Sequence, residues 1–423
     1  MNQTMNEKEP TYFVSCPSGV EKLLVDELAS FGLNDLKQEK GGVSLQTADE
    51  KEIISVVLNS RLASRVFKIL QSYTIYDKDD LYRMASQKWW HKEFDVDQTF
   101  KIQTLFDFKA KKILKNSNVY GLTLKDAICD QFRKECNKRP DVAKEDPDIS
   151  LTLRIEDKYP NRKKNEDAPE KNNFMAIISI DLCGTPLNFR GYRSAYHQAP
   201  LRENLAAALI MASDWKPNEE ILFDGMCGSA TILIEAALIA GGVSPSYLRV
   251  FEAIENNQQV FAFEEQSWFV DNNQLKNWFY DHIDQECKNN KNKLKNIEPG
   301  LIFGSDISPG FLKSARANLK EARIPKEAVR VDLGDATKDG PGANQKSGVY
   351  ICNPPYGERL VQEDIEKLYY DLGENLKNNW KGFRAYVFTS DPSLRKKIAL
   401  QTSERIPFFN GKLECRLLKY DLY

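Results

Sequence analysis

The chain has 423 residues, of which 41% are hydrophobic and 28% are charged, and its formal net charge at pH 7 is −2. These values are typical of a soluble protein with a substantial core, and the length predicts two or three domains rather than one. The sequence contains no apolar run of about 18 residues and no apolar segment between Met1 and Pro10, so neither a membrane span nor a signal peptide is expected.

The first part of the chain alternates strand and helix patterns. Apolar periodicity and turn residues predict a strand at 11–16, a helix ending near Gly32, a strand after Gly41-Gly42, a helix around Ile53–Leu58 and a strand at Arg65–Ile75. This order predicts a small ferredoxin-like α+β domain, which we assign to residues 1–76.

A second unit is predicted at residues 77–190. Its expected elements are a helix at Leu81–Trp90, a strand at Thr99–Phe106, a helix at Thr123–Cys136, and strands at Ile149–Ile155 and Phe174–Ile180. A hairpin turn after Leu182 is expected to lead into a further strand at Leu187–Arg190. Residues 156–173 carry almost no apolar side chains and are expected to form a mobile surface insertion.

The segment from Lys109 to Arg139 is basic within a nearly neutral protein. It holds nine Lys or Arg residues against three acidic ones. A local basic patch is the electrostatic footprint of contact with a phosphate backbone, although a solvated helix face is an equally plain explanation. The candidate nucleic-acid contacts are Lys109, Lys111, Lys112, Lys115, Arg133 and Lys134.

From residue 191 to 423, strand and helix patterns alternate in the manner of a parallel, doubly wound sheet. Strands are predicted at Ile221–Phe223, Leu301–Phe303, Val329–Asp332, Val349–Cys352 and Ala385–Thr389. Helices are predicted at Leu205–Ala212, Thr231–Ala240 and Pro309–Ala322, and from near Glu363 to Trp380. Residues 243–300 interrupt the alternation as an insertion that we expect to be helical. Asn410-Gly411 predicts a type I′ hairpin between the last two strands.

Polar residues follow several of these strands. Asp224 to Thr231 (Asp-Gly-Met-Cys-Gly-Ser-Ala-Thr) follows the first strand, where small residues allow a ligand to approach the backbone. The segment is not G-x-G-x-x-G and lacks a P-loop lysine, so triphosphate binding is not favoured. Asp224 suits a ligand that bears an amino group. Asp306 could accept from ribose hydroxyls and Asp335 from an adenine amino group, whereas each aspartate taken alone could simply cap a helix.

The fourth strand leads into Asn353-Pro354-Pro355-Tyr356. Two prolines cannot continue a sheet, so a stiff extended loop is expected. The Asn353 amide oxygen and the Pro354 carbonyl are two acceptors that could hold an exocyclic amino group, and Tyr356 could stack on a base. An ordinary strand-to-helix turn is the alternative.

This set of strand-end residues resembles that of the class I S-adenosylmethionine-dependent methyltransferases that act on amino groups of bases. The continuation to Leu360, with Arg190-Gly191-Tyr192-Arg193, Ala199-Pro200-Leu201 and N-terminal segments such as Ser60–Arg65, is similar to a narrower group. These are the bacterial large-subunit (23S) ribosomal RNA guanine-N2 methyltransferases, which carry an N-terminal RNA-binding THUMP domain.

The resemblance implies a Rossmann-like methyltransferase domain at 191–423 and a THUMP domain at 77–190 that binds ribosomal RNA. The eight cysteines form no Cys-x-x-Cys pair and there are only three histidines, so a zinc site is not expected, and reduced thiols in the cytoplasm are the simplest account. The resemblance also implies that S-adenosyl-L-methionine is bound by Asp224, Met226, Cys227, Gly228, Ser229, Thr231, Asp306, Asp335, Ala336 and Asn353. The implied catalytic residues are Asn353, Pro354, Pro355 and Tyr356.

Two positions depart from the family pattern, since Gly225 stands where proline is usual and Ala230 where glycine is usual. Ala230 would be unfavourable if its backbone needs a positive φ. Three alternatives stay open at this point: an N6-adenine methyltransferase acting on RNA or DNA, a tRNA guanine-N2 methyltransferase, and a non-catalytic RNA-binding protein.

Overall fold

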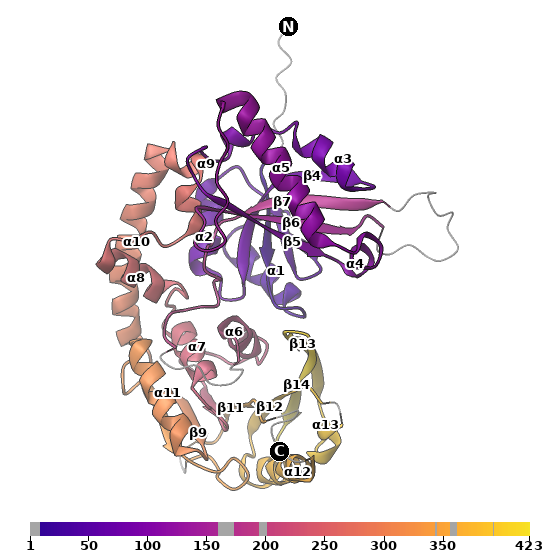
Figure 1. Ribbon diagram of the computed structural model, residues 1–423. Helices are drawn as coiled ribbons and strands as arrows, with labels where there is room; N and C mark the ends of the chain where they lie inside the picture. The colour runs from indigo at the N-terminus through magenta and orange to yellow at the C-terminus, as the bar shows by residue number, and fades with distance from the viewer. Residues whose placement is uncertain (1–8, 160–172, 194–200, 343–344, 356–361, 392) are drawn as a thin grey trace.

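The computed structural model describes residues 9–159, 173–193, 201–342, 345–355, 362–391 and 393–423. It contains two seven-stranded sheets. The first lies in the N-terminal region (residues 9–190) and the second in the C-terminal region (residues 191–423), stacked along the long axis of the molecule (Figure 1).

The first sheet has the strand order β2-β3-β1-β4-β7-β6-β5. Its first elements are β1 (Thr11–Ser15), α1 (Glu21–Ser30), β2 (Lys37–Glu39), β3 (Gly42–Gln46), α2 (Glu50–Asn59) and β4 (Arg65–Ile75). β1 pairs antiparallel with both β3 and β4. Leu24, Leu28, Ile53 and Val57 of the two helices are buried in one core with β1. This is the ferredoxin-like alternation predicted from the apolar pattern.

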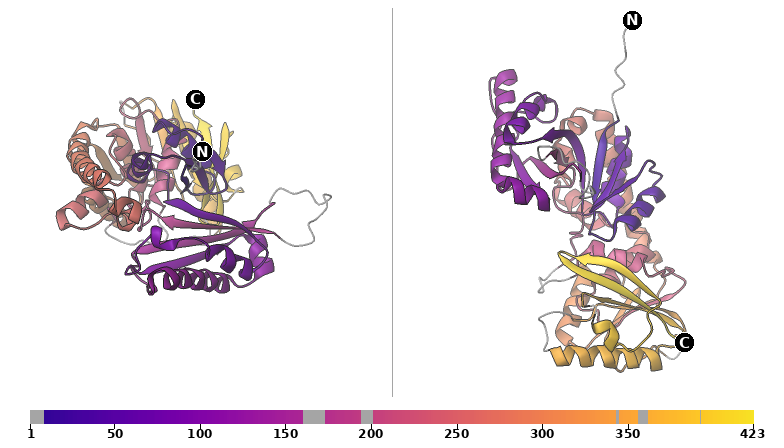
Figure 2. Two further views of the ribbon diagram at one scale, coloured as in Figure 1. Left: turned by 90° about the horizontal axis from the view of Figure 1, so that it is seen from above. Right: turned by 90° about the vertical axis from the view of Figure 1, so that its right-hand side faces the viewer.

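The same sheet continues into the second predicted unit, because β4 pairs antiparallel with β7. The added elements are α3 (Lys78–Ala85), β5 (Phe100–Phe106), α4 (Phe108–Leu114), α5 (Ser117–Cys136), β6 (Ile149–Asp157) and β7 (Phe174–Asp181). The helices α3, α4 and α5 cover one face of the sheet (Figure 2) and enclose a separate core with Trp90, Phe100 and Phe132.

Two local predictions differ from the structure. Leu187–Arg190 forms a turn and not a strand, because the Arg190 guanidinium is buried and donates a 2.6 Å hydrogen bond to the Leu187 carbonyl. The C-terminal hairpin loop is Gly411-Lys412, since Asn410 pairs with Leu413 in the ladder. Gly411 alone has a positive φ, +63°, which fits a type II′ turn with glycine first. The predicted mobile insertion falls largely on residues 160–172, outside the described residues.

The second sheet has the order β10-β9-β8-β11-β12-β14-β13. Its strands are β8 (Ile221–Asp224), β9 (Ile302–Asp306), β10 (Val329–Leu333), β11 (Gly348–Cys352), β12 (Phe383–Thr389), β13 (Glu404–Asn410) and β14 (Leu413–Asp421). Its helices are α6 (Glu203–Met211), α7 (Thr231–Ala240), α11 (Pro309–Glu321), α12 (Gln362–Asn379) and α13 (Leu394–Lys397). The first five strands are parallel, and β14 runs antiparallel to its neighbours β12 and β13, which confirms the predicted doubly wound class.

Residues 243–300 are helical, as predicted. They form α8 (Tyr247–Asn256), α9 (Ser267–Val270) and α10 (Asn273–Lys293), which run along one side of both regions (Figure 1). Phe263 N–H donates to the Leu182 carbonyl at 3.1 Å, and the Lys68 ammonium lies 5.6 Å from the centre of the Trp268 ring. The insertion therefore contacts the N-terminal region directly.

β13 makes a second contact between the regions. A Cβ added to Gly19, whose φ is +89°, would lie 2.7 Å from the Pro407 carbonyl oxygen. Only glycine at position 19 allows this loop and β13 to approach each other so closely. Among the described helices, none is long and apolar enough to cross a membrane.

Candidate active site

Four neighbouring strands of the second sheet carry the predicted polar residues at their carboxyl ends. In the order β10-β9-β8-β11, Asp224 pairs with Gly304 and with Ile351, while Asp306 pairs with Leu333. Because these strands are parallel, the residues that follow them meet at one edge of the sheet. The structure thus brings Asp224, Asp306, Asp335 and Asn353 to the same edge.

The segment after β8 wraps over the end of β9. Cys227 N–H donates to the Ser305 carbonyl at 2.9 Å, and Gly228 N–H donates to Asp306 Oδ2 at 2.9 Å. Gly228 and Ala230 both have left-handed backbones, with φ of +52° and +67°. These conformations make a tight loop directly before α7, whose first residue is Thr231. Ala230 therefore occupies a position that favours glycine.

Gly225 is required by a neighbouring tyrosine. A Cβ at this position would lie 1.8 Å from Tyr350 Oη, so any side chain, including the proline that the sequence resemblance leads us to expect, would force Tyr350 to move. The Tyr350 ring is itself held by Phe223 and Trp380, at centroid distances of 5.9 and 4.7 Å. The departure at Gly225 is thus coupled to an aromatic cluster beneath the loop.

Asp224 is buried at the bottom of the site, with 1% of its surface exposed. Burial raises the pKa of this carboxyl, a hydrogen bond from Met226 N–H lowers it and the charge of Asp306 raises it, with a net pKa of about 8. A buried carboxyl whose proton affinity is raised in this way favours a ligand that brings a cationic amino group, because the ligand would restore the charged form.

Asp306 and Asp335 each hold part of the backbone. Asp306 accepts from Ser308 N–H at 2.9 Å as well as from Gly228, and a carboxylate with two such bonds still has lone pairs for ribose hydroxyls. Asp335 accepts from Thr337 N–H at 3.0 Å and from Lys338 Nζ at 2.7 Å. Burial raises the pKa of Asp335, but hydrogen bonds from Lys338 and Thr337 outweigh it and lower the pKa. The adjacent Ala336 is buried.

Two exposed apolar side chains flank the Asp306 position. Ile307 is 70% exposed and Leu333 is 64% exposed, and Leu333 pairs with Asp306 across the ladder. Large apolar side chains left open beside polar strand ends offer a surface for a flat ring. The sequence analysis did not identify either residue. Each directly follows an aspartate at the end of a strand, and this pattern could have marked them as candidate ligand contacts.

Asn353 follows the last residue of β11. Its Oδ1 is inaccessible to solvent and has no hydrogen-bond partner among the described residues. Leaving a buried acceptor unpaired costs about 1–3 kcal/mol, so such groups call for an explanation. Pro354 is buried and Pro355 half-buried. Tyr356 lies outside the described residues.

The six predicted nucleic-acid contacts fall into two groups. Lys109, Lys111 and Lys112 lie on α4, and Lys115 follows it. Arg133 and Lys134 lie at the far end of α5, whose 20 residues span roughly 30 Å. The structure therefore does not gather them into one patch.

Several of these cations also have acidic partners. The Lys109 ammonium lies 2.9 Å from Asp157, and the Arg133 guanidinium lies 2.6 Å from Asp130. Lys111 and Lys112 are exposed beside Phe108, which is 86% exposed. The α4 group is thus the part most available to a phosphate backbone.

All eight cysteines are free thiols. Among the described residues, no group of three or more His, Cys, Asp or Glu side chains is arranged to hold a metal ion.

Three family models match separate parts of the chain. The RMKL-like methyltransferase domain matches residues 190–419, the RlmL ferredoxin-like domain matches residues 11–67, and the THUMP domain matches residues 76–159. Among curated proteins, the ribosomal RNA large subunit methyltransferase K/L of Psychromonas ingrahamii is 34% identical over 421 residues, which are 97% of this chain and 50% of the relative. The chain spans about half the length of the curated relatives it matches.

Solved structures share the whole fold. A protein of Clostridium difficile 630, described as a possible methylase, is 27% identical with a TM-score of 0.78 and covers 98% of this chain and 99% of its own. SMU.472, described as a candidate methyltransferase and crystallised with SAH, is 24% identical with a TM-score of 0.77, and 99% of both chains are covered.

Proposed function

Because the chain belongs to the family of RlmL-like methyltransferases that carry a THUMP domain, we propose that it methylates the N2 amino group of a guanosine in large-subunit ribosomal RNA. The cofactor is S-adenosyl-L-methionine, which supplies a sulfonium methyl group when bound. The SAH in the related SMU.472 structure supports this choice.

The observation that carries the proposal is the buried Oδ1 of Asn353 at the sheet edge, for which the described part of the chain offers no hydrogen-bond partner. An exocyclic amino group has two N–H bonds, which Asn353 Oδ1 and the Pro354 carbonyl would accept. Holding both protons turns the nitrogen lone pair toward the methyl group and stabilises the positive charge that develops on nitrogen. The base must leave its stack to reach this position. Pro355 would stiffen the loop, and Tyr356 would stack on the base.

The strand-end residues fit the three parts of the cofactor. Asp224, buried and with its pKa raised, would accept the cationic amino group of the methionine part. Gly228, Ser229 and Thr231 would present the loop and the start of α7, with Met226 and Cys227 shaping its floor. Asp306 would accept from the ribose hydroxyls. The adenine would lie between Ile307 and Leu333, with Asp335 and Ala336 at its edge.

We further propose that the chain has three domains with different roles. Residues 1–76 form a ferredoxin-like domain, residues 77–190 a THUMP domain that binds RNA, and residues 191–423 the methyltransferase domain. Ribosomal RNA is the substrate favoured by the names of the curated relatives, which would place the enzyme in the cytoplasm.

The reaction is tested by incubating the protein with unmodified large-subunit ribosomal RNA and S-adenosylmethionine, followed by mass analysis of the nucleosides. We expect N2-methylguanosine. N6-methyladenosine would overturn the choice of base, methylation of tRNA alone would overturn the choice of RNA, and no product with no cofactor binding would favour a non-catalytic RNA-binding protein.

Asn353→Ala tests the amino-group acceptor. We expect kcat to fall about 10²- to 10³-fold, as for loss of one group that binds developing charge, while the Kd for the cofactor stays within about twofold. Asn34→Ala, which removes an exposed amide in the N-terminal region, is the matched control and should leave kcat unchanged. Turnover by Asn353→Ala close to that of the unaltered protein would contradict the assigned role.

A further inference from the structure

One face of α7 connects the proposed cofactor loop with the N-terminal region. Thr231 and Glu235 are four residues apart and Leu238 is three further on, so the three lie on the same side of the helix. Thr231 is the first residue after the proposed cofactor loop. Glu235 is completely buried, with 0% exposure. The contacts along this face therefore act on the helix that carries the loop.

Arg190 and Arg193 bind the first half of this face, and both lie in the connecting segment, the stretch between the end of β7 and the start of α6. Arg193 Nη2 donates to Thr231 Oγ1 at 3.2 Å, and Arg193 Nε lies 2.6 Å from Glu203. Arg190 is 1% exposed, and its Nε lies 3.4 Å from Glu235 Oε1. The contacts of Arg193 stay within the C-terminal region, whereas Arg190 is the last residue of the N-terminal region and reaches α7 from the boundary between the two.

Arg61 binds the other end of α7 and comes from the N-terminal region. Its Nη2 donates to the Leu238 carbonyl at 3.2 Å and to the Val243 carbonyl at 2.7 Å. The Arg61 carbonyl accepts a 2.7 Å bond from Arg190 Nη2, and its backbone N–H donates to Glu27 of α1 at 2.8 Å. One residue thus joins α1, the connecting segment and the end of α7.

The charges at this junction are buried and incompletely paired. Burial lowers the pKa of the Arg61 guanidinium, and the charge of Glu235 partly offsets this. Burial raises the pKa of Glu235, which Arg190 and Arg61 lower. Arg61 Nη1 and Glu235 Oε2 both lack a hydrogen-bond partner among the described residues. The guanidinium therefore attracts α7 by charge as well as through the carbonyls it binds.

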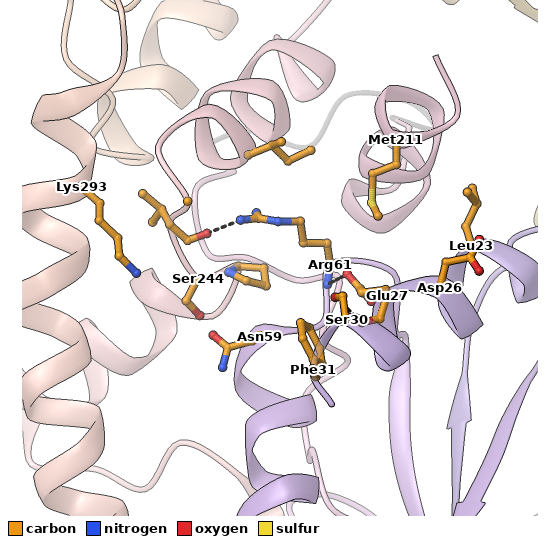
Figure 3. Close-up of a pocket in the computed structure, with 14 residues that line it drawn as sticks. Leu23, Asp26, Glu27, Ser30, Phe31, Asn59, Arg61, Met211, Ser244 and Lys293 are labelled. Carbon is orange, nitrogen blue, oxygen red and sulfur yellow. Dashed lines mark hydrogen bonds between the residues drawn. The ribbon is translucent and has the colours of Figure 1, made fainter. Parts of the chain in front are cut away.

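A cavity of about 610 Å³ adjoins Arg61, with Asp26 and Ser30 of α1, Met211 at the end of α6 and Lys293 of α10 around it (Figure 3). In Figure 3 the Arg61 side chain runs through the middle of the lining residues. Close packing does not fill this part of the junction, so van der Waals contact does little there to fix the end of α7. The position of the end of α7 therefore depends on the hydrogen bonds that Arg61 donates.

We propose that Arg61 is a positioning residue for the cofactor site, which it holds from the N-terminal region through α7 and the loop between Asp224 and Thr231. The inference rests on the proposed function, because it takes that loop to be the cofactor site. It means that cofactor affinity depends on how the N-terminal region is docked on α7, although Arg61 lies outside both the proposed cofactor loop and the proposed RNA-binding residues.

The test is calorimetric titration of the full chain with SAH, together with steady-state kinetics. Arg61→Met should raise the Kd for SAH and the KM for S-adenosylmethionine about 3- to 30-fold, the range for residues that act on a site at a distance. The kcat and the affinity for ribosomal RNA should stay unchanged. Arg61→Lys, which keeps the charge but not the two-carbonyl geometry, should restore part of the affinity.

Asn204→Ala is the matched control. Asn204 of α6 holds the same N-terminal loop as Arg61, donating to the Leu62 carbonyl at 3.3 Å and to Ser64 Oγ at 2.9 Å, neither of which belongs to α7. It should leave the Kd for SAH unchanged. Equal weakening by Arg61→Met and Asn204→Ala would overturn the inference in favour of a general loss of docking, and so would unaltered SAH binding by Arg61→Met.

The remaining outcomes separate this inference from the proposed function. If Arg61→Met does not fold, as judged by its Tm, the Arg61→Lys measurement decides, and a Kd equal to that of the unaltered protein overturns the inference. If the unaltered protein itself binds no SAH, the proposed function fails first and the inference falls with it.

Discussion

Asp224 gives the chain a pH-dependent stability that can be measured without substrate. Burial raises the pKa of its carboxyl from the usual 3.8 to about 8 in the folded protein. A group whose pKa is higher in the folded state contributes stability that is fully present below its unfolded pKa and is lost as pH rises through the folded pKa. The loss therefore runs between about pH 4 and pH 8, and at about 1.4 kcal/mol for each pKa unit it reaches on the order of 5 kcal/mol.

Asp224→Asn keeps the shape of the side chain and removes its titration. We expect the variant to be more stable than the unaltered protein by an amount that grows with pH between 6 and 8 and then levels off. Chemical denaturation at several pH values, followed by a probe in the methyltransferase domain, measures this difference. Asp332→Asn removes an exposed carboxylate of β10 and should show no growing difference. A stability difference for Asp224→Asn that does not change with pH would refute the reasoning.

The same carboxyl links cofactor binding to proton release. Below pH 8 it is largely protonated in the free protein, and a cationic amino group placed against it would expel the proton. Titration with SAH at pH 6.5, in two buffers of different ionisation enthalpy, should report release of about one proton by the unaltered protein. Asp224→Asn should bind SAH weakly and release none. Equal heats in the two buffers for the unaltered protein would contradict the coupling.

Two further predictions concern the loop and the basic helix. Ala230→Gly should stabilise the protein by about 0.5 kcal/mol, because relief of the left-handed backbone outweighs the added chain entropy of glycine, and a Tm below that of the unaltered protein would contradict this. Lys111→Glu with Lys112→Glu should weaken ribosomal RNA binding and lower its salt dependence by about two phosphate contacts, measured by filter binding at several salt concentrations. Lys377→Glu with Lys381→Glu changes the net charge equally at the end of α12 and should have little effect on ribosomal RNA binding. If both pairs weaken RNA binding equally, α4 is not a specific RNA contact.

Local pattern was enough for the elements and their classes. The helix α7 and the strands β4 and β11 lie within one residue of their predicted ranges, because the period of apolar residues directly reports which face is buried. The edge of the second sheet was also predictable, since parallel strands bring their carboxyl ends together whatever their exact packing. Motif and fold class therefore follow from short-range sequence.

Charge counting along the chain was a poorer guide. The basic segment has a clear excess of Lys and Arg, but the length of α5 separates its two ends, and Asp157 on β6 binds one of its lysines. A count of charges along the sequence does not show how far a helix separates its two ends, nor which acidic residues of other strands pair with the lysines. For this reason the α4 group stands out only in three dimensions.

The chain's local sequence determined most of its helices and strands, the parallel class of the second sheet and the polar strand ends on which the chemistry is proposed. The tertiary structure alone decided that β4 and β7 join the first two units in one sheet, that Tyr350 leaves room only for glycine at position 225, and that Arg61 reaches α7. These contacts join residues about a hundred positions apart or more. Periodicity describes only how a segment faces its own core, whereas such contacts depend on how separately formed elements pack against each other.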